Sequence, residues 1–262
     1  MMKKLQNIKN RLYPAVLLLA LLVLWQLVTA TGLVPEYMLP SPIRVLEALI
    51  GSFSELMQHA SVSLIEALVG LSISIVLAFG FALLMDRYPV LHKMMHPVLV
   101  ITQTIPPVAL APMLVLWFGY EMEPKIVLVV LVCFFPMTVS LLGGLRNADM
   151  DAMNLMRAMG ARKSQIYRYI KLPSALPGFF AGVRISVSYA MVGAVVAEWL
   201  GGNAGLGVYM TRVRKSYSFD KMFAVIIVII VVSLILMKCV EILEKRFMPW
   251  NKVLRQRTEE SQ

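Results

Sequence analysis

Six apolar runs of about 20 residues, nearly free of charged side chains, constrain this chain of 262 residues more than any other feature. A helix of that length crosses about 30 Å of hydrocarbon, and in lipid every backbone polar group must be bonded within the protein. The sequence therefore predicts an all-α integral membrane protein with six transmembrane helices. The predicted spans are residues 13–30, 64–85, 97–118, 126–145, 179–200 and 222–242.

The composition supports this interpretation. Hydrophobic residues make up 59% of the chain and the mean hydropathy is +0.74, values outside the range of soluble domains. The sequence lacks ten-residue blocks of alternating polarity, which argues against a membrane β-barrel.

The first span has basic residues before it and small residues after it, as a signal peptide does. Its apolar run is longer than the core of a signal peptide, which favours a retained helix.

The basic residues indicate topology rather than nucleic-acid binding. The formal net charge is +10, but Lys and Arg fall in the short gaps between apolar runs instead of on one polar face. Loops rich in Lys and Arg remain in the cytoplasm. This rule predicts a transmembrane domain of residues 13–242, with a cytoplasmic N-terminal tail (1–12), a cytoplasmic loop (146–176) and a cytoplasmic C-terminal tail (243–262). One outer cluster opposes the rule, and it is either a solvated loop or a docking rim for an acidic partner: Arg212, Arg214, Lys215 and Lys221.

Two outer segments have local patterns of their own. After Pro40 and Pro42, apolar residues recur at helical spacing, which predicts a short helix in the outer interface. These residues are Val45, Leu46, Leu49 and Ile50. The glycine-rich segment 201–207 follows a membrane helix rather than a strand, so we expect a close-packed turn and not a phosphate cradle.

No constellation in the sequence indicates an enzyme. The predicted topology puts His59 outside and both His92 and His96 inside, so no metal site or Ser-His pair converges. Cys133 and Cys239 lie in apolar runs and are interpreted as small hydrophobic side chains. A G-x-x-x-x-G-K-[ST] phosphate loop is absent, so this chain is not expected to bind ATP. We therefore expect no catalytic residue, no metal and no cofactor.

Five charged residues fall inside or at the edges of the predicted spans, where ionisable groups are costly and are functional candidates by default. All five lie near span ends, so we expect each to reach water. They are Glu66, Arg184, Glu198, Lys238 and Glu241.

Uncharged polar residues mark a candidate substrate passage instead. Residues 101–112 read ITQTIPPVALAP, and the two adjacent prolines are expected to break the third span in its middle. Such a break is tolerated where the helix lines a cavity. The fifth span offers hydroxyls beside Gly182 and Gly193, small residues that permit close helix approach or serve packing alone. The predicted passage residues are Thr102, Gln103, Thr104, Pro106, Pro107, Ser186, Ser188 and Tyr189.

The long inner loop is expected to form two short helices. Residues 149–159 read DMDAMNLMRAM, a helix with Asp149 or Asp151 near its start, and Gly160 is suited to end it. Ser164 is expected to cap a second helix, QIYRYIKL, which Pro173 and Pro177 would stop. Apolar residues of the loop must pack on the bundle's inner surface or against a second protein. They are Met153, Met156, Met159 and Ile166.

The loop resembles the signature loop of ATP-binding-cassette (ABC) importer permeases, in which E-A-A, three residues and a glycine are followed after nine residues by I-x-L-P. Gly160, Ile170, Leu172 and Pro173 match this pattern, whereas residues 154–156, at the E-A-A positions, read Asn, Leu and Met. LPSP near Pro40, EWLGGNAGLG at 198–207 and the six-span order extend the likeness. In detail the chain is similar to the branch that serves nitrate, taurine, aliphatic sulfonates and the pyrimidine precursor of thiamine.

The resemblance implies a type I ABC importer permease fold in the inner membrane of a bacterium. It implies a homodimer with a second permease copy, a dimer of ATPase subunits that binds ATP, and an extracytoplasmic substrate-binding protein. The loop would insert into the ATPase as a coupling helix. The coupling residues it implies are Met156, Arg157, Ala158, Met159, Gly160, Ala161, Ser164, Ile170, Leu172 and Pro173.

Among substrates, a thiamine pyrimidine precursor such as formylaminopyrimidine or hydroxymethylpyrimidine is favoured over sulfonate, taurine or nitrate. Two other classes are weighed. An autonomous secondary transporter or channel would place ionisable or unwound sites at the midplane, often in paired repeats, and the sequence has no internal repeat. An intramembrane hydrolase would need a nucleophile with a base in reach, and no such pair is visible.

Overall fold

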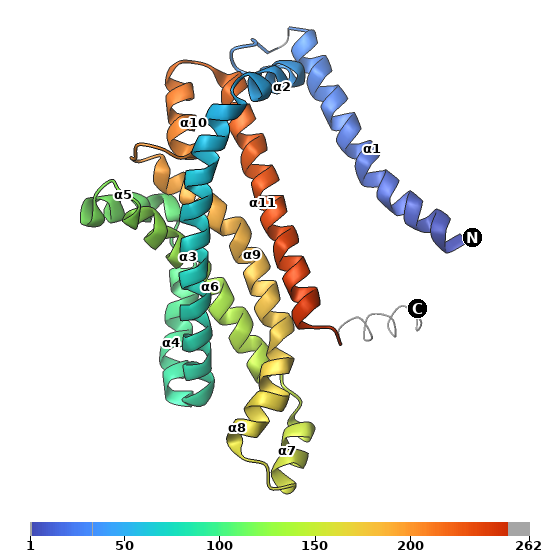
Figure 1. Cartoon of the computed structure of the whole chain (residues 1–262), viewed down its shortest axis with the longest axis vertical. Helices are drawn as coiled ribbons and strands as arrows, with labels where there is room; N and C mark the ends of the chain where they lie inside the picture. The colour runs from blue at the N-terminus through green and yellow to red at the C-terminus, as the bar shows by residue number, and fades with distance from the viewer. Residues whose placement is uncertain (1, 33, 251–262) are drawn as a thin grey trace.

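The computed structural model describes residues 2–32 and 34–250, and these are almost entirely helical (Figure 1). Five helices are long and apolar enough to cross a membrane, and one bent pair raises the number to six if it is counted as one span. The prediction of an all-α membrane protein is therefore confirmed. The long helices are α1 (Met2–Ala30), α3 (Phe53–Arg87), α6 (Glu123–Arg146), α9 (Leu172–Glu198) and α11 (Phe219–Phe247). The shorter ones are α2 (Pro42–Gly51), α4 (Pro89–Thr102), α5 (Pro107–Phe118), α7 (Met150–Ala158), α8 (Lys163–Ile166), the π-helix η1 (Tyr167–Lys171) and α10 (Leu206–Lys215).

The helices α6 and α9 form the centre of the bundle, and glycines bring their backbones together. A Cβ atom at Gly182 would lie 2.9 Å from Ser140 Cβ, and one at Gly144 would lie 2.9 Å from Ala175 Cα. Inside a membrane, helices associate through close van der Waals packing rather than through a hydrophobic driving force. The small residues expected to permit close approach therefore serve packing between α6 and α9.

The third predicted span is not one bent helix. It begins earlier, at Pro89, and its two halves α4 and α5 meet at an angle of 100°. Pro106 is extended (φ −63°, ψ 128°) and, like Pro107, has no backbone N–H to continue the helix. The expected break is present, but it is a sharp corner, so α5 lies across the bundle instead of along it (Figure 1).

The helix α1 slants away from the rest of the bundle (Figure 1). Residues 2–12, expected as a tail, continue this helix at its N-terminal end. Its attachment is at the other end, where Trp25 Nε1 donates a hydrogen bond of 3.1 Å to the carbonyl of Pro40 and the Trp25 ring lies 5.6 Å from that of Phe223.

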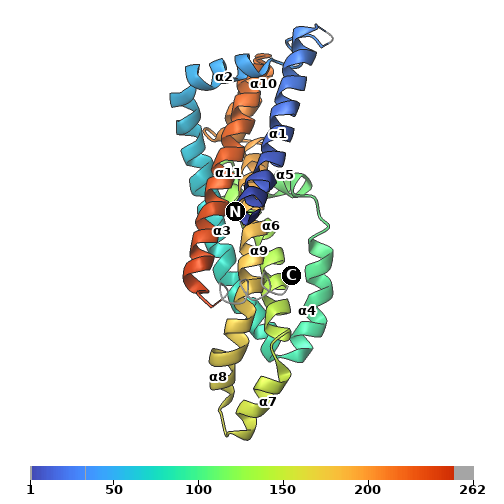
Figure 2. The ribbon, with the colours of Figure 1, turned by 90° about the vertical axis from the view of Figure 1, so that its right-hand side faces the viewer.

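The molecule has two different ends (Figure 2). One carries α7 and α8, and we call it the loop end; the opposite end, which carries α2 and α10, we call the α10 end. The short helix expected after Pro40 and Pro42 is present as α2, with Val45 buried against the bundle. The outer basic cluster is not a plain loop, because Arg212, Arg214 and Lys215 form the last turn of α10, where the helix dipole favours cations. Of the expected C-terminal tail, residues 251–262 lie outside the described residues.

Candidate functional site

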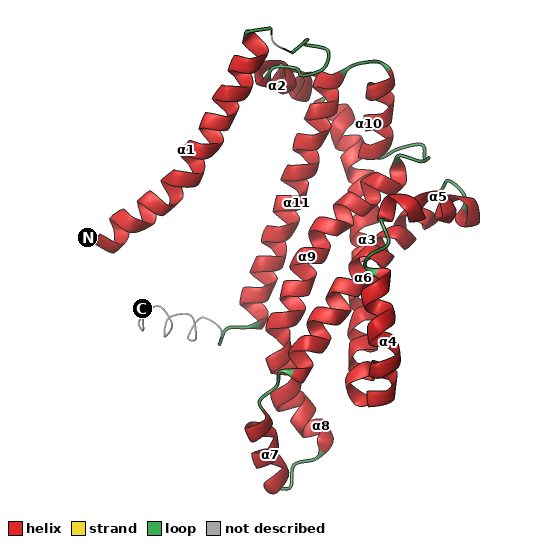
Figure 3. Ribbon diagram, turned by 180° about the vertical axis from the view of Figure 1, so that it is seen from behind, coloured by secondary structure: helices red, strands yellow, loops and turns green. Residues whose placement is uncertain are grey.

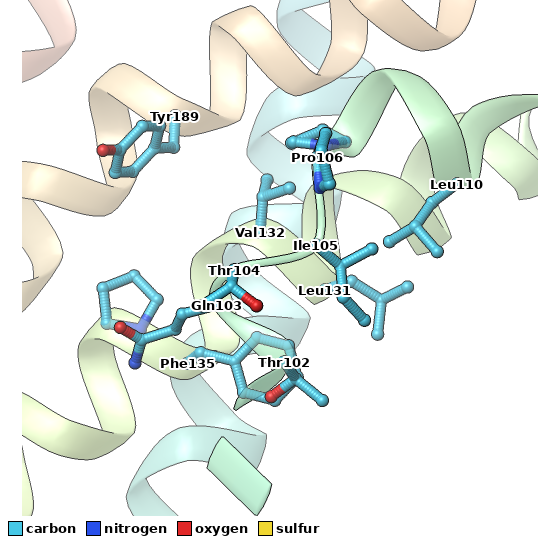
Figure 4. A pocket seen from close by; sticks show the side chains of 12 residues that line it. Thr102, Gln103, Thr104, Ile105, Pro106, Leu110, Leu131, Val132, Phe135 and Tyr189 are labelled. Atoms are coloured by element: carbon cyan, nitrogen blue, oxygen red, sulfur yellow. The ribbon is translucent and has the colours of Figure 1, made fainter. Parts of the chain in front are cut away.

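A cavity of about 300 Å³ lies where α4 and α5 meet. Its lining comes from the break itself, from α6 and from α9 (Figure 4). The lining residues are Thr102, Gln103, Thr104, Ile105, Pro106, Pro107, Leu110, Leu131, Val132, Phe135, Pro136 and Tyr189. None of them is charged.

The break presents hydrogen-bonding groups to an otherwise apolar cavity. The Thr102 hydroxyl donates to the carbonyl of Val98 at 2.8 Å, and the Thr104 hydroxyl donates to that of Ile101 at 2.7 Å. These bonds occupy the hydroxyl protons and leave oxygen lone pairs as acceptors. The Gln103 amide adds two donors and one acceptor, and the Tyr189 hydroxyl can do either. The cavity therefore suits a small ligand with both donors and acceptors and no net charge.

Six of the eight predicted passage residues line this cavity, and two do not. Ser186 is buried between α9 and α6, where its hydroxyl donates to the carbonyl of Cys133 at 3.1 Å. Ser188 points to α11 and lies 3.6 Å from the sulfur of Met237. The sequence prediction selected these two serines for their polar side chains alone. Their positions around the axis of α9 point them at α6 and α11 instead of at the cavity. The α6 face of the cavity is formed by apolar residues, and no polar side chain in that segment marks it in the sequence.

The first helix of the protruding loop forms as predicted. Asp149 caps α7, because its carboxylate accepts from the amides of Asp151 at 2.9 Å and Ala152 at 3.2 Å. Gly160 ends the helix with φ of +80°. The amide of Ala161 donates to Met156 O at 2.9 Å and that of Gly160 to Arg157 O at 3.0 Å. These two bonds form a Schellman motif, the geometry that a glycine at this position permits.

The second helix of the loop differs from the prediction. It starts after Arg162 rather than at Ser164, and the Arg162 amide donates to the Gln165 side chain at 2.6 Å. It then widens into η1 and runs into α9 as one continuous helical segment from 163 to 198 (Figure 3). Pro173 and Pro177 do not stop it. Pro173 lies in the first turn after the π-helix, whose wider register accommodates the missing N–H.

The loop has a small core and an exposed apolar surface. Met153 and Ile166 are buried against each other's helices, with Met156 and Ile170 packed beside them. Met159 is 77% exposed. Of the implied coupling residues, Met156, Ala161 and Ile170 pack against this core and Leu172 and Pro173 lie half-buried at the joint. The exposed ones are Arg157, Ala158, Met159, Gly160 and Ser164. Leu155 and Tyr169 extend the exposed surface, and neither is among the implied coupling residues.

Two carboxylates expected to reach water are instead buried near the α10 end. Glu66 is fully buried, with its carboxylate 3.2 Å from Lys125 Nζ. Glu198 accepts hydrogen bonds from the Ser63 hydroxyl at 2.6 Å and the Gly207 amide at 2.5 Å. Burial is tolerated because bonded or paired charges avoid the full cost of desolvation. Of the other span charges, Lys238 and Glu241 pair with each other at the helix surface, and Arg184 pairs with Glu244.

Buried polar side chains of α3 hold the glycine-rich segment 201–207 in place. The Leu206 amide donates to the Ser63 hydroxyl at 2.8 Å, and the Gly205 amide donates to His59 Nδ1 at 3.0 Å. These bonds tie the start of α10 to α3, and they explain the close-packed turn expected from the glycines.

A membrane-spanning helical bundle with an uncharged cavity at a helix break, and with a protruding two-helix loop, has the architecture of a transport permease. The chain belongs to the family of binding-protein-dependent transport system inner membrane components, whose sequence profile matches residues 70–249. It is accordingly a multi-pass membrane protein and a permease of the ABC importer class.

Individual relatives agree on this class. The chain is 38% identical over 236 residues to a probable ABC transporter permease protein from Haemophilus influenzae, covering 90% of this chain and 96% of that protein. It is 37% identical over 242 residues to the formylaminopyrimidine transport permease protein ThiX of Halalkalibacterium halodurans, covering 92% and 96%. It is 30% identical over 245 residues to a putative aliphatic sulfonates transport permease protein, SsuC, of Bacillus subtilis, covering 92% and 87%.

A solved structure shows the same fold. The inward-facing methionine ABC transporter MetNI contains a chain that superposes with a TM-score of 0.61 at 18% sequence identity, covering 76% of this chain and 97% of that one. The prediction of a type I ABC importer permease fold is therefore confirmed.

Proposed function

We propose that this permease carries a small, uncharged pyrimidine, such as formylaminopyrimidine or hydroxymethylpyrimidine, through the cavity at the α4–α5 break. The observation that carries the proposal is the lining of that cavity, which combines an amide, hydroxyls and two aromatic rings without a charge. A pyrimidine can stack on Phe135 or Tyr189 and exchange hydrogen bonds with Gln103. The relative that is named for formylaminopyrimidine transport supports the same substrate class.

A sulfonate, taurine or nitrate is the alternative solute, and the sulfonate permease at 30% identity supports it. An anion in this cavity would lose water without gaining a cation, because none of the lining side chains is charged. Removing an unpaired charge from water costs several kcal/mol. The uncharged lining therefore favours the neutral solute.

The protruding loop is proposed to couple this passage to a separate ATPase subunit, which binds the ATP. Its exposed apolar residues, with Met159 the most exposed, offer a surface that a partner protein can cover, and methionine adapts to a surface that must repack. In this proposal the loop end faces the cytoplasm, as do both termini. The described basic residues of the loop support that orientation, because Lys and Arg are retained on the cytoplasmic side.

Two further partners complete the proposed importer. A second copy of the chain forms the other half of the passage, since Tyr189 at the cavity is 51% exposed in one copy. A substrate-binding protein delivers the solute at the α10 end. The implied coupling set from Met156 to Pro173 remains a proposal together with these partners.

Reconstitution of the chain with its ATPase subunit and binding protein tests the proposal. ATP-dependent uptake of labelled hydroxymethylpyrimidine is expected, with little uptake of taurine. Gln103→Leu should lower the uptake about tenfold, the cost of losing hydrogen bonds worth about 1.5 kcal/mol. Ser188→Ala is the matched control, because that hydroxyl lies outside the cavity, and it should leave uptake unchanged. Preferential taurine uptake would contradict the pyrimidine assignment, and uptake without ATP would favour an autonomous transporter.

A further inference from the structure

A buried carboxylate joins the transmembrane helix α3 to the base of the protruding loop. Asp86 lies in the last turn of α3, and its side chain is 4% exposed. Lys171 Nζ donates to both of its oxygens, at 2.9 Å and 2.7 Å, and the Tyr167 hydroxyl donates to Oδ2. Lys171 Nζ also lies 4.9 Å from the centre of the Tyr167 ring. The three side chains therefore form one bonded cluster.

Both partners of Asp86 belong to the π-helix η1. Tyr167 and Lys171 stand four residues apart, so they project from consecutive turns toward the same neighbour. The wider turn of η1 is the joint at which the short helix α8 becomes the membrane helix α9. A π-helix inside a longer helix commonly marks a functional position. Here it directs two side chains onto one carboxylate of another helix.

The loop thus reaches the membrane helices by two routes. One is the continuous helix through η1 into α9, and α9 in turn packs against α6 through Gly178 and Gly182. The other is the Asp86 cluster, which connects η1 to α3. Because Asp86 is nearly buried and the Lys171 side chain is only 18% exposed, this ion pair is screened by water and salt far less than a surface pair.

The surroundings of Asp86 make its charge essential to this contact. A cavity of about 200 Å³ beside it is lined by further basic side chains and by no acidic residue other than Asp86. The basic residues are Arg87, Arg157, Lys163 and Lys171. Without the carboxylate, the three cations of the loop would face Arg87 at the end of α3, and like-charge repulsion would push η1 away from α3.

We propose that Asp86 is a positioning residue that, with Lys171 and Tyr167, makes the end of α3 move together with α9 when the loop is displaced. This inference rests on the proposed coupling role of the loop. It assigns to the cluster the transfer of loop movement to α3, a second membrane helix, which packs against both α6 and α9, the helices that line the passage. Loss of the cluster then separates ATP hydrolysis from transport without detaching the ATPase.

The test uses the full complex of permease, ATPase and binding protein in liposomes, with hydroxymethylpyrimidine as the transported probe. Asp86→Asn and Lys171→Met are expected to raise the ATP hydrolysed per molecule imported about tenfold, with unchanged ATPase bound per permease. Asp86→Glu, which keeps the carboxylate among these basic side chains, should hold the ratio to within about twofold of the unaltered protein. Glu241→Gln is the matched control, because that ion pair is exposed at the surface of α11 and its loss should not change the ratio.

A second measurement follows movement rather than transport. Spin labels at position 84 on α3 and position 168 on η1, both exposed, are placed in a chain with Cys239→Ser, since Cys133 is buried. In assembled complexes the distance between the labels should stay constant when ATP is added, and it should change on ATP addition in the Asp86→Asn variant. The inference is overturned if the Asp86→Asn variant hydrolyses no more ATP per molecule imported than the unaltered protein. It is also overturned if the label distance in that variant stays constant when ATP is added. A wild-type complex that retains no ATPase overturns the proposed function instead.

Discussion

The carboxylate of Glu198 fills the space that a side chain at position 205 would need. A Cβ atom built on Gly205 collides with the carboxyl carbon and both oxygens of Glu198, and the backbone there has φ of +124°. The same carboxylate accepts a hydrogen bond from the Gly207 amide. The buried acid and the glycine segment are therefore one structural unit, and each explains the residue type of the other.

Gly205→Ala should disrupt this unit. The methyl group would displace the Glu198 carboxylate while forcing alanine into a backbone region that suits glycine, and we expect a loss of about 3 kcal/mol in unfolding free energy. Thermal unfolding of the detergent-solubilised protein measures it. Gly80→Ala is the control, because a Cβ atom there meets nothing within 4 Å. A Gly205→Ala protein as stable as the control would contradict the fit between Glu198 and Gly205.

Length and hydropathy were sufficient to predict the long helices, because lipid imposes helical bonding on every apolar run. They were not sufficient to predict which side of each helix faces the cavity. Tyr189 and Ser186 are three residues apart on α9, yet only Tyr189 lines the cavity. The side of a membrane helix that faces a cavity depends on which neighbours pack against it, and these come from distant parts of the sequence.

The buried charges were mispredicted for a related reason. Glu66 and Glu198 stand near span ends, where a carboxylate on an isolated helix reaches water. In the fold, Lys125 and the glycine segment cover that end, and they come from two separate parts of the chain.

The π-helix at 167–171 was also missed, because proline is expected to end a helix and its tolerance here depends on the wider turn that precedes it.

Lys125→Met should be one of the most destabilising single changes at the α10 end. It leaves the Glu66 carboxylate, which is fully buried, without its cation, and we expect a loss of about 3–5 kcal/mol in unfolding free energy. The double variant with Glu66→Gln should recover most of the loss, because the unpaired charge is then removed.

The control for that pair is Arg44→Met, which breaks the ion pair with Glu36, whose two side chains are 57% and 62% exposed. A surface pair of this kind contributes less than about 1 kcal/mol. Equal losses from Lys125→Met and Arg44→Met in thermal unfolding would show that the Glu66–Lys125 pair is not buried in the membrane-embedded protein.

Gly182→Leu should separate the two central helices. A Cβ atom at this position already approaches Ser140 Cβ to 2.9 Å, so a larger side chain must force α9 away from α6, at a cost of about 1–3 kcal/mol in unfolding free energy. Solute uptake should fall with it, because α6 and α9 both line the cavity. Gly143→Leu on α6 is the control, since that position has no neighbour within 4 Å. Loss of uptake in both variants would point to a general effect of leucine rather than to helix packing.

Gly160→Gln tests the end of the loop's first helix. The position has φ of +80° and open space around it, so glutamine would strain the backbone by about 1–2 kcal/mol without striking any side chain of this chain. We expect the protein to insert normally while ATPase association falls about tenfold, measured as ATPase recovered per permease on purification. Gly160→Asn is the matched comparison, because asparagine adopts the left-handed conformation more readily, and it should retain more ATPase than glutamine does. Full association and full transport in the glutamine variant would contradict a coupling role for this turn, because the Schellman motif would then matter only to the loop itself.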